Sequence, residues 1–173
     1  MNFQKSAFLA IFFLSCFIGL SLCCDGYKIK LNSIKNCGGA KQVVKVSENT
    51  TLKLTKECDV IPSNACVKSE GFKTAQATYR ISKNGIPVMN GKADLCGEMA
   101  KSGDDVKGML EMFGLPTACP IEKTDLCSSS GQKVNIKKNK QFLSMAMGKI
   151  SIHTDVVHDT GKSCFEAEIT VKK

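Results

Sequence analysis

Cysteine and histidine are the residues of this chain best suited to chemistry, and their spacing decides which chemistry they can perform. The sequence has 173 residues, with 10 cysteines and 2 histidines. Cys119 and Cys127 flank a Cys-Pro pair and a short charged run, but no C-x-x-C pair occurs, and His153 and His158 lie far along the chain from them. The usual spacings of zinc ligands are therefore missing. We expect no metal and no cofactor.

Nucleophilic catalysis has little support either. A cysteine nucleophile needs a thiolate of low pKa beside a base, and a chain with many other cysteines favours a disulfide instead. No G-x-S-x-G motif is present, and both histidines lie in or beside one predicted strand. The neighbouring carboxylates Asp104 and Asp105 fit the start of a helix better than an acid/base pair. The sequence predicts a protein that is not an enzyme.

The first two dozen residues have the character of a secretory signal peptide. In "MNFQKSAFLAIFFLSCFIGLSLCC", Lys5 is the only charge, and an apolar run followed by small residues comes after it. The run is close to the lower limit for spanning a bilayer, and no basic cluster follows it. We predict a signal peptide over residues 1–23 and one soluble domain over 24–173. Cleavage after Cys23 fits best, with Ser21 and Cys24 as alternatives.

A secreted chain keeps its cysteines in an oxidising compartment, extracellular or the lysosomal lumen, where they form disulfides. Eight would pair completely if cleavage spares the first of them: Cys24, Cys37, Cys58, Cys66, Cys96, Cys119, Cys127 and Cys164. Asn49 begins an N-glycosylation sequon. The net charge is +8, but the lysines are scattered and tryptophan is absent. No nucleic-acid partner is therefore expected.

Hydrophobic residues recur mainly with a period of two, which indicates strands that each have one wet face. The clearest segments are 27–35, 51–56, 75–82, 149–156 and 163–172. Turn signals separate such segments at Asn84-Gly85, Asn90-Gly91, Ser130-Gly131 and Asp159-Thr160-Gly161. Residues 101–116 instead show helical spacing. The pattern predicts a single antiparallel β-sandwich that carries a short helical insert.

Several motifs occur together in an order that resembles a known family. They are "KNCGG" (35–39), "CDVIPSNAC" (58–66), the helical segment 95–116, "ACPIEK" (118–123) and "GKSCFEAEITVKK" (161–173). The arrangement resembles the ML family of secreted lipid-recognition domains, to which the Niemann-Pick type C sterol carrier and the ganglioside activator protein belong. The resemblance covers almost all of the mature chain. It implies an all-β fold, an immunoglobulin-like two-sheet antiparallel sandwich, with a lipid cavity between the sheets.

The resemblance also implies how the cysteines pair. Cys37 would join Cys164, Cys58 would join Cys66, and Cys96 would join Cys119. Cys127 has no counterpart in the sterol carrier, which leaves Cys24 as its partner.

The expected pocket has a soft, apolar lining. Methionine adapts to irregular guests, and the chain concentrates methionines in two segments, the helical insert and "FLSMAMGK". We expect these two segments to form the pocket mouth together. The candidate lining residues are Leu54, Tyr79, Ile81, Met109, Met112, Phe113, Leu115, Phe142, Leu143, Met145, Met147 and Ile152.

Two functions compete on this basis. The first is a secreted lipid-binding or transfer protein that holds a sterol, fatty acid or glycolipid. Lysines near the second methionine segment, Lys133, Lys137, Lys138, Lys140 and Lys149, would suit an anionic membrane surface, and a receptor is the other partner considered. The alternative function is a disulfide-rich recognition or signalling module, of the innate immune, salivary or venom type, that acts through protein contacts.

Overall fold

The computed structural model describes residues 23–103, 107, 110–111, 115–128, 132–139 and 141–173. The predicted signal peptide lies outside these residues apart from Cys23. Within the described part, no helix has the length and apolarity needed to cross a membrane.

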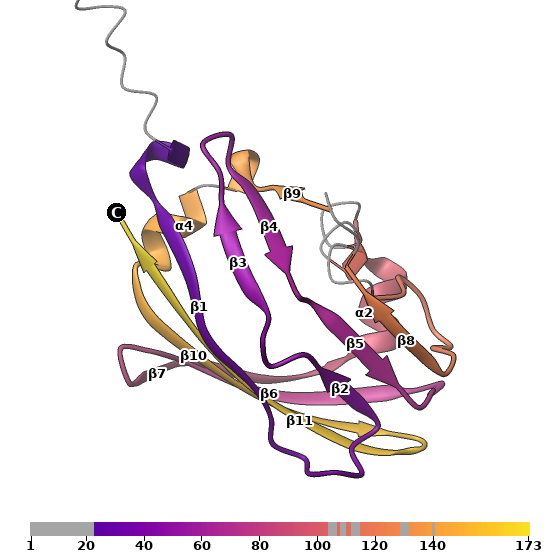
Figure 1. The fold of residues 1–173 in the computed structure, drawn as a ribbon. Helices are drawn as coiled ribbons and strands as arrows, with labels where there is room; N and C mark the ends of the chain where they lie inside the picture. The colour runs from indigo at the N-terminus through magenta and orange to yellow at the C-terminus, as the bar shows by residue number, and fades with distance from the viewer. Residues whose placement is uncertain (1–22, 104–106, 108–109, 112–114, 129–131, 140) are drawn as a thin grey trace, which may run out of the picture.

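One layer of the fold is a five-stranded antiparallel sheet (Figure 1). Its strands, in spatial order, are β1 (Lys28–Asn36), β11 (Gly161–Lys172), β10 (Gly148–His158), β6 (Ala75–Lys83) and β7 (Ile86–Asp94). The alternation read from the sequence reappears as burial: Ser163 and Val171 of β11 are buried, while Glu166 is exposed. Each strand therefore turns one row of side chains toward the second layer.

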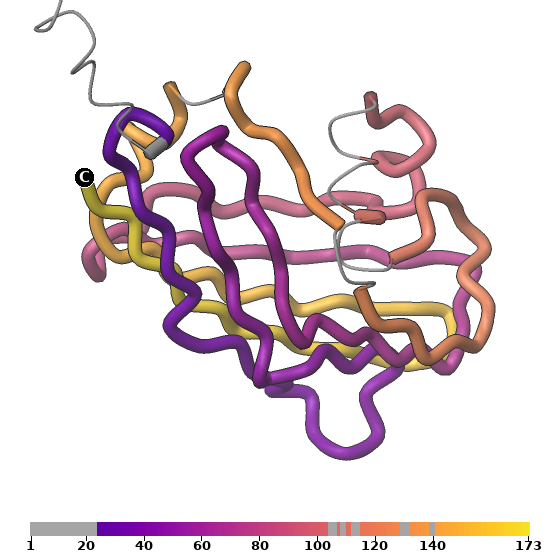
Figure 2. Tube along the Cα trace, turned by 45° about the horizontal axis from the view of Figure 1, so that its top comes forward, coloured from indigo at the N-terminus to yellow at the C-terminus, as the bar shows by residue number. Residues whose placement is uncertain are grey.

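The second layer consists of two three-stranded antiparallel sheets that lie over the first (Figures 1 and 2). One contains β2 (Val44–Val46), β5 (Cys66–Ser69) and β8 (Thr124–Cys127), and the other contains β3 (Thr51–Leu54), β4 (Asp59–Ser63) and β9 (Val134–Asn135). Four short helical segments complete the described part: η1 (Cys23–Gly26), α2 (Leu95–Lys101), η2 (Lys137–Asn139) and α4 (Gln141–Met145). The predicted all-β, disulfide-bonded sandwich with a short helical insert is confirmed.

The two α-helices lie at opposite ends of the sandwich (Figure 1). The α2 helix begins at Leu95, the start of the helical segment 95–116 and ahead of the periodic residues 101–116, because the Asp94 side chain caps it by accepting a hydrogen bond from the Gly97 N–H at 3.2 Å. It ends at Lys101, beyond which Lys107, Leu110 and Glu111 have helical backbone. The other residues of the expected insert between 104 and 114 lie outside the described part.

The predicted turns have mixed outcomes. Asn84 and Gly85, both with positive φ (51° and 82°), join β6 to β7, and the turn after His158 joins β10 to β11. The turn expected at Asn90-Gly91 is wrong, because both residues continue β7. Gly91 pairs with Tyr79, and a Cβ on it would lie 2.6 Å from the Tyr79 hydroxyl oxygen. The absence of a side chain at Gly91 therefore leaves space for the Tyr79 ring and does not mark a turn. Ser130-Gly131 lies outside the described residues.

Two of the four implied disulfides occur and two are wrong. Cys37–Cys164 ties β1 to β11, and Cys96–Cys119 ties α2 to the segment before β8. Cys58 and Cys66 do not pair with each other, because the extended strand β4 lies between them and carries them apart.

The remaining four cysteines pair with spatial neighbours. Cys24 joins Cys58, beside a hydrogen bond from the Cys24 N–H to the Lys56 carbonyl at 3.0 Å. Cys127 joins Cys66, its direct partner in the register of β5 and β8. The expected pair Cys24–Cys127 is therefore wrong as well.

Candidate functional site: a cavity between the sheets

A cavity of about 510 Å³ lies between the two layers at the α2 end of the sandwich. Its volume falls within the range of ligand pockets, about 300–1,000 Å³. Both layers and α2 contribute to its wall, which is predominantly apolar. The apolar lining residues are Val44, Val46, Val67, Phe72, Leu95, Met99, Leu110, Leu115, Pro116, Ile121, Val156 and Phe165.

Strand alternation explains why small branched side chains face this space. In β5, Val67 and Ser69 are buried and line the cavity, whereas Lys68 between them is exposed and lies 3.9 Å from Asp125. On the facing sheet, Ala75 and Ala77 of β6 are 0% and 3% exposed and pack with Val156. The lining side chains Val67, Ser69 and Val156 are short and reach only part of the way across the gap between sheets spaced about 10 Å apart, so space remains between them.

The segment between Cys119 and Cys127 forms one wall and is fixed at both ends. Cys119 is bonded to Cys96 of α2, and Cys127 is bonded to Cys66 of β5. Between them, Ile121 is 6% exposed and forms a backbone bridge with Phe72. The segment suggested catalytic cysteines by composition, but its two cysteines hold a cavity wall in place.

Few buried polar side chains line the cavity. Ser69 is 2% exposed and His158 is 7% exposed, and they lie on facing layers. His158 Nε2 lies 3.0 Å from Ser163 Oγ, while Nδ1 is buried and has no hydrogen-bond partner among the described residues. Burial lowers the pKa of His158, an effect that the nearby negative charge of Asp159 partly opposes.

The charged lining residues are placed differently. Glu98 and Lys101 both belong to α2, and both are exposed. The cavity thus has charge only where water reaches it.

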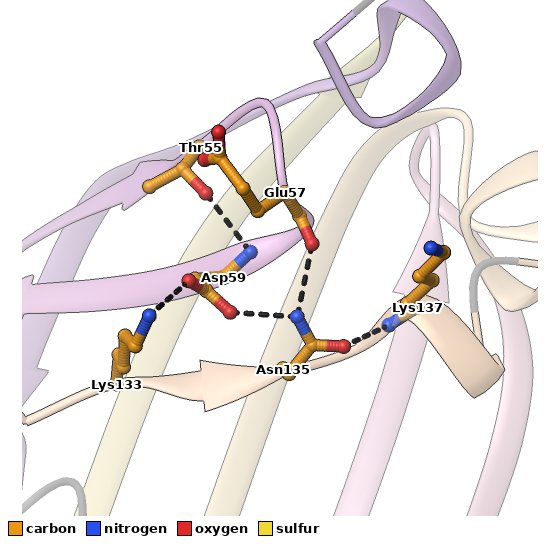
Figure 3. Close-up of polar contacts among 6 residues, drawn as sticks. All are labelled: Thr55, Glu57, Asp59, Lys133, Asn135 and Lys137. Carbon is orange, nitrogen blue, oxygen red and sulfur yellow. Dashed lines mark hydrogen bonds and ion pairs between the residues drawn. The ribbon is translucent and has the colours of Figure 1, made fainter.

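A second buried polar cluster is structural. The Asp59 side chain is 7% exposed, and it accepts hydrogen bonds from Lys133 Nζ at 2.6 Å and from Asn135 at 2.7 Å (Figure 3). These bonds lower the pKa of Asp59, with the Lys133 contact as the largest cause. The Asn135 amide also donates to the Glu57 carbonyl, so the cluster ties β9 to the turn before β4 (Figure 3). Each carboxylate oxygen of Asp59 accepts a hydrogen bond from the β9 side, which accounts for the burial of this charge.

One group of potential metal ligands occurs among the described residues. Cys37, His153 and Cys164 bring their ligand atoms within 4.8 Å of one another. The two sulfur atoms form a disulfide with each other, and a disulfide does not offer the thiolate that binds zinc. His153 Nε2 instead lies 3.0 Å from Asp155 and Nδ1 lies 3.3 Å from Glu166, on the outer face of the large sheet.

Of the predicted pocket residues that the structure describes, Leu115 alone lines the cavity. Leu54 and Leu143 belong to a hydrophobic cluster at the opposite end of the sandwich. Phe142, Met145 and Met147 also lie at that end and are 53%, 62% and 39% exposed. The expectation that both methionine segments form one pocket mouth is therefore wrong for this segment.

The remaining candidates divide into two groups. Tyr79, Ile81 and Ile152 lie on β6 and β10 but do not line the cavity. Met109, Met112 and Phe113 lie outside the described residues. Asn49 is exposed in the turn between β2 and β3, and its glycosylation stays a prediction.

Sequence reasoning missed most of the true lining, including Phe72, Leu95, Met99 and Ile121. These residues lie beside strand ends or in α2, where no period of two marks them. His158 could have been predicted as a lining residue. It lies two residues after Val156 in the same strand, so both side chains point to the same face of the sheet.

These features define a class: a disulfide-bonded antiparallel β-sandwich with an apolar cavity between its sheets. No protein-family model matches the chain. The chain is 35% identical over 151 residues to the sporozoite-associated mosquito saliva protein 1 of Anopheles gambiae, covering 86% of this chain and 83% of that protein. It belongs to the family of that saliva protein.

Among solved structures, the chain is similar to chicken MD-1 complexed with lipid IVa. The sequence identity is 12%, the TM-score is 0.32, and the match covers 81% of this chain and 87% of that chain. A likeness this distant carries no conclusion about function, so membership of the ML family remains a prediction from the sequence.

Proposed function

We propose that this protein is a secreted, non-catalytic lipid-binding protein that holds a hydrophobic ligand between its two sheets. The observation that carries the proposal is the cavity of about 510 Å³ with its predominantly apolar lining. A well-packed sandwich of this size would have filled that space with side chains. The sequence resemblance to the ML family supports the same function, with a sterol, fatty acid or glycolipid as the ligand.

The energetics of such binding are favourable without strong polar contacts. Burying a chain of about sixteen carbons contributes on the order of 13 kcal/mol, at about 0.8 kcal/mol per methylene. Association and ordering costs remove a large part of this gain. Micromolar affinity or better is therefore within reach of an apolar wall alone.

Secretion is supported by two observations. All eight cysteines from Cys24 onward form disulfides, which persist in oxidising compartments. The relative in Anopheles gambiae is by name a saliva protein. We infer that this chain, too, acts outside the cell.

The proposal can be tested by the same substitution at two methionines. Both lie in short helices, but only one of them lines the cavity. Met99 of α2 lines the cavity, and Met145 of α4 is exposed at the other end. Met99→Asp should weaken uptake of a fluorescent fatty acid or sterol about tenfold, since it brings a carboxylate into an apolar wall. Met145→Asp adds the same charge and should leave uptake unchanged.

The alternative, a recognition module that acts through protein contacts, makes the opposite prediction. Protein purified from its own source would then show no co-purifying lipid by native mass spectrometry, and neither variant would alter uptake. Either result would remove the carrier function.

A further inference from the structure

The cavity contains one polar atom whose hydrogen-bonding capacity is unused. His158 lines the cavity and is 7% exposed, and its Nδ1 is buried without a partner in the part of the chain that the structure describes. Leaving a buried polar group unpaired is unfavourable, because the group has lost its hydrogen bonds to water without gaining a partner. A ligand atom that paired with Nδ1 would recover this free energy.

The neighbouring serine decides which nitrogen carries the proton. Ser163 Oγ accepts a hydrogen bond from the Val44 N–H at 2.9 Å and lies 3.0 Å from His158 Nε2. Among the described residues, Nε2 is the acceptor that the Ser163 hydroxyl proton can reach. If the serine donates to Nε2, the neutral imidazole must carry its own proton on Nδ1. Burial lowers the pKa of His158, so the ring is neutral at neutral pH.

The ring is also held in a fixed position. The centroids of the His158 and Phe72 rings lie 4.4 Å apart. Asp159 accepts hydrogen bonds from the backbone N–H groups of Lys73 and Thr74 at 2.9 and 3.1 Å, which ties the end of β10 to the segment after Phe72. A donor held this firmly loses little entropy on meeting a ligand.

We propose that His158 is the polar anchor of the cavity, and that its Nδ1–H donates a hydrogen bond to a neutral oxygen at the buried end of the bound lipid. The inference rests on the proposed lipid-binding function and narrows its ligand class. It selects lipids whose buried end carries a hydroxyl or carbonyl oxygen over pure hydrocarbon.

The charge distribution of the wall favours a neutral group at this end. The Phe72 ring lies 4.4 Å from the His158 ring and Val156 precedes His158 on the same strand face, so a carboxylate placed beside these apolar side chains would be expensive to desolvate. Charged lining side chains are confined to the exposed residues Glu98 and Lys101 of α2. An amphiphile with a charged headgroup would place that headgroup at α2.

The test compares two probes that differ by one oxygen. Tridecan-2-one has an acceptor oxygen and no donor, and tridecane has neither. Both would displace a fluorescent apolar probe from wild-type protein, from His158→Phe and from His153→Phe. Phenylalanine keeps a ring against Phe72, and His153 provides the same substitution on the outer face.

We expect the ratio of ketone to alkane affinity to fall about tenfold in His158→Phe and to stay unchanged in His153→Phe. Comparing this affinity ratio between variants removes the difference in hydration free energy between the two probes, because that difference is the same for every variant. If the ketone-to-alkane affinity ratio is unchanged in His158→Phe, then His158 is not the polar anchor, while the proposed lipid-binding function still stands. If neither probe binds wild-type protein, both proposals fail.

A second measurement does not depend on whether His158→Phe folds. In wild-type protein labelled with ¹⁵N-histidine, the ketone should shift the Nδ1 resonance of His158, and the alkane should not. An Nδ1 resonance that stays still while the ketone binds would refute the anchor.

Discussion

Strand β11 contributes to both ends of the sandwich, yet the α4 end is packed and the α2 end is hollow. At the α4 end, a cluster of buried residues fills the space between the layers: Cys24, Tyr27, Cys58, Leu143 and Val171. At the α2 end, the corresponding buried residues are Ala75, Ala77 and Val156. The fully buried side chains at the α2 end are therefore smaller than those at the α4 end, and the cavity lies beside them.

Both ends expose some hydrophobic side chains to solvent. At the α4 end, Ile86 of β7 and Met145 of α4 are 67% and 62% exposed, and Lys83 Nζ donates to the Met145 carbonyl at 2.6 Å. At the α2 end, Leu126 of β8 and Val157 of β10 are 43% and 52% exposed, while the apolar side chains that line the cavity face inward. Exposed hydrophobic residues thus occur at both ends, whereas the cavity lies at the α2 end.

The largest expected effect comes from removing one disulfide at each end. Cys24→Ala with Cys58→Ala should cost about 2–5 kcal/mol of stability and leave lipid uptake intact at low temperature. Cys66→Ala with Cys127→Ala should cost a similar amount and also reduce uptake, because it frees β8, a wall of the cavity. Urea denaturation and probe binding measure the two effects. Equal uptake by both double variants would contradict the distinction between the ends.

The second largest effect is expected from truncating a buried side chain at the packed α4 end. Leu143→Ala removes a side chain that is 7% exposed and should lower the free energy of unfolding by about 2–5 kcal/mol. Uptake by the folded protein should not change, since Leu143 lies away from the cavity. A loss of uptake at temperatures where the variant is folded would show that the two ends are coupled.

Filling the cavity at the α2 end should have the opposite effects: lipid uptake should fall, and the free energy of unfolding should change little. Val46→Phe places a larger side chain into existing space and should reduce uptake about tenfold with little change in the urea midpoint. Val88→Phe adds the same volume on β7, where Val88 is 58% exposed, and serves as the control. Undiminished uptake by Val46→Phe would place the ligand elsewhere.

The smallest effect concerns acid stability. The pKa of Asp59 is lower in the folded protein than its ordinary value of 3.8, so its stabilising contribution is complete above about pH 4 and is lost as the pH falls through the lowered folded value. Asp59→Asn should therefore be less stable than wild type at pH 7, and the difference should shrink as the pH falls below 3.8 and through the lowered folded pKa. Asp125→Asn, in an exposed pair at 3.9 Å, should show no such difference.

Local patterns predicted the fold well and the site poorly, for one reason. The period of two in segments such as 163–172 reports which side chains face inward, and burial follows it. The same period does not report how far along the sandwich a residue lies. Leu143 and Leu115 were both predicted to line the pocket, but Leu143 fills the packed end and only Leu115 lines the cavity.

Contacts between segments far apart in the sequence were the second feature that local patterns could not predict. Cys58 and Cys66 are close in sequence, but the extended strand between them keeps them apart. Cys66 meets Cys127 because β5 and β8 are neighbours in the second layer, and no local pattern encodes that register. His158 was considered only as a metal ligand or a catalytic base and not as a pocket residue, since its burial depends on Phe72 and Ser163 from other segments.

The Cys96–Cys119 disulfide has a consequence for how this family can change. It closes a loop at its base, and the described residues of that loop contribute Met99, Leu110 and Leu115 to the cavity without pairing with any strand of the five-stranded sheet. Insertions, deletions or substitutions inside that loop can reshape the ligand space while every strand register stays as it is. Relatives that share the sandwich can diverge in ligand preference by exchanging this one segment.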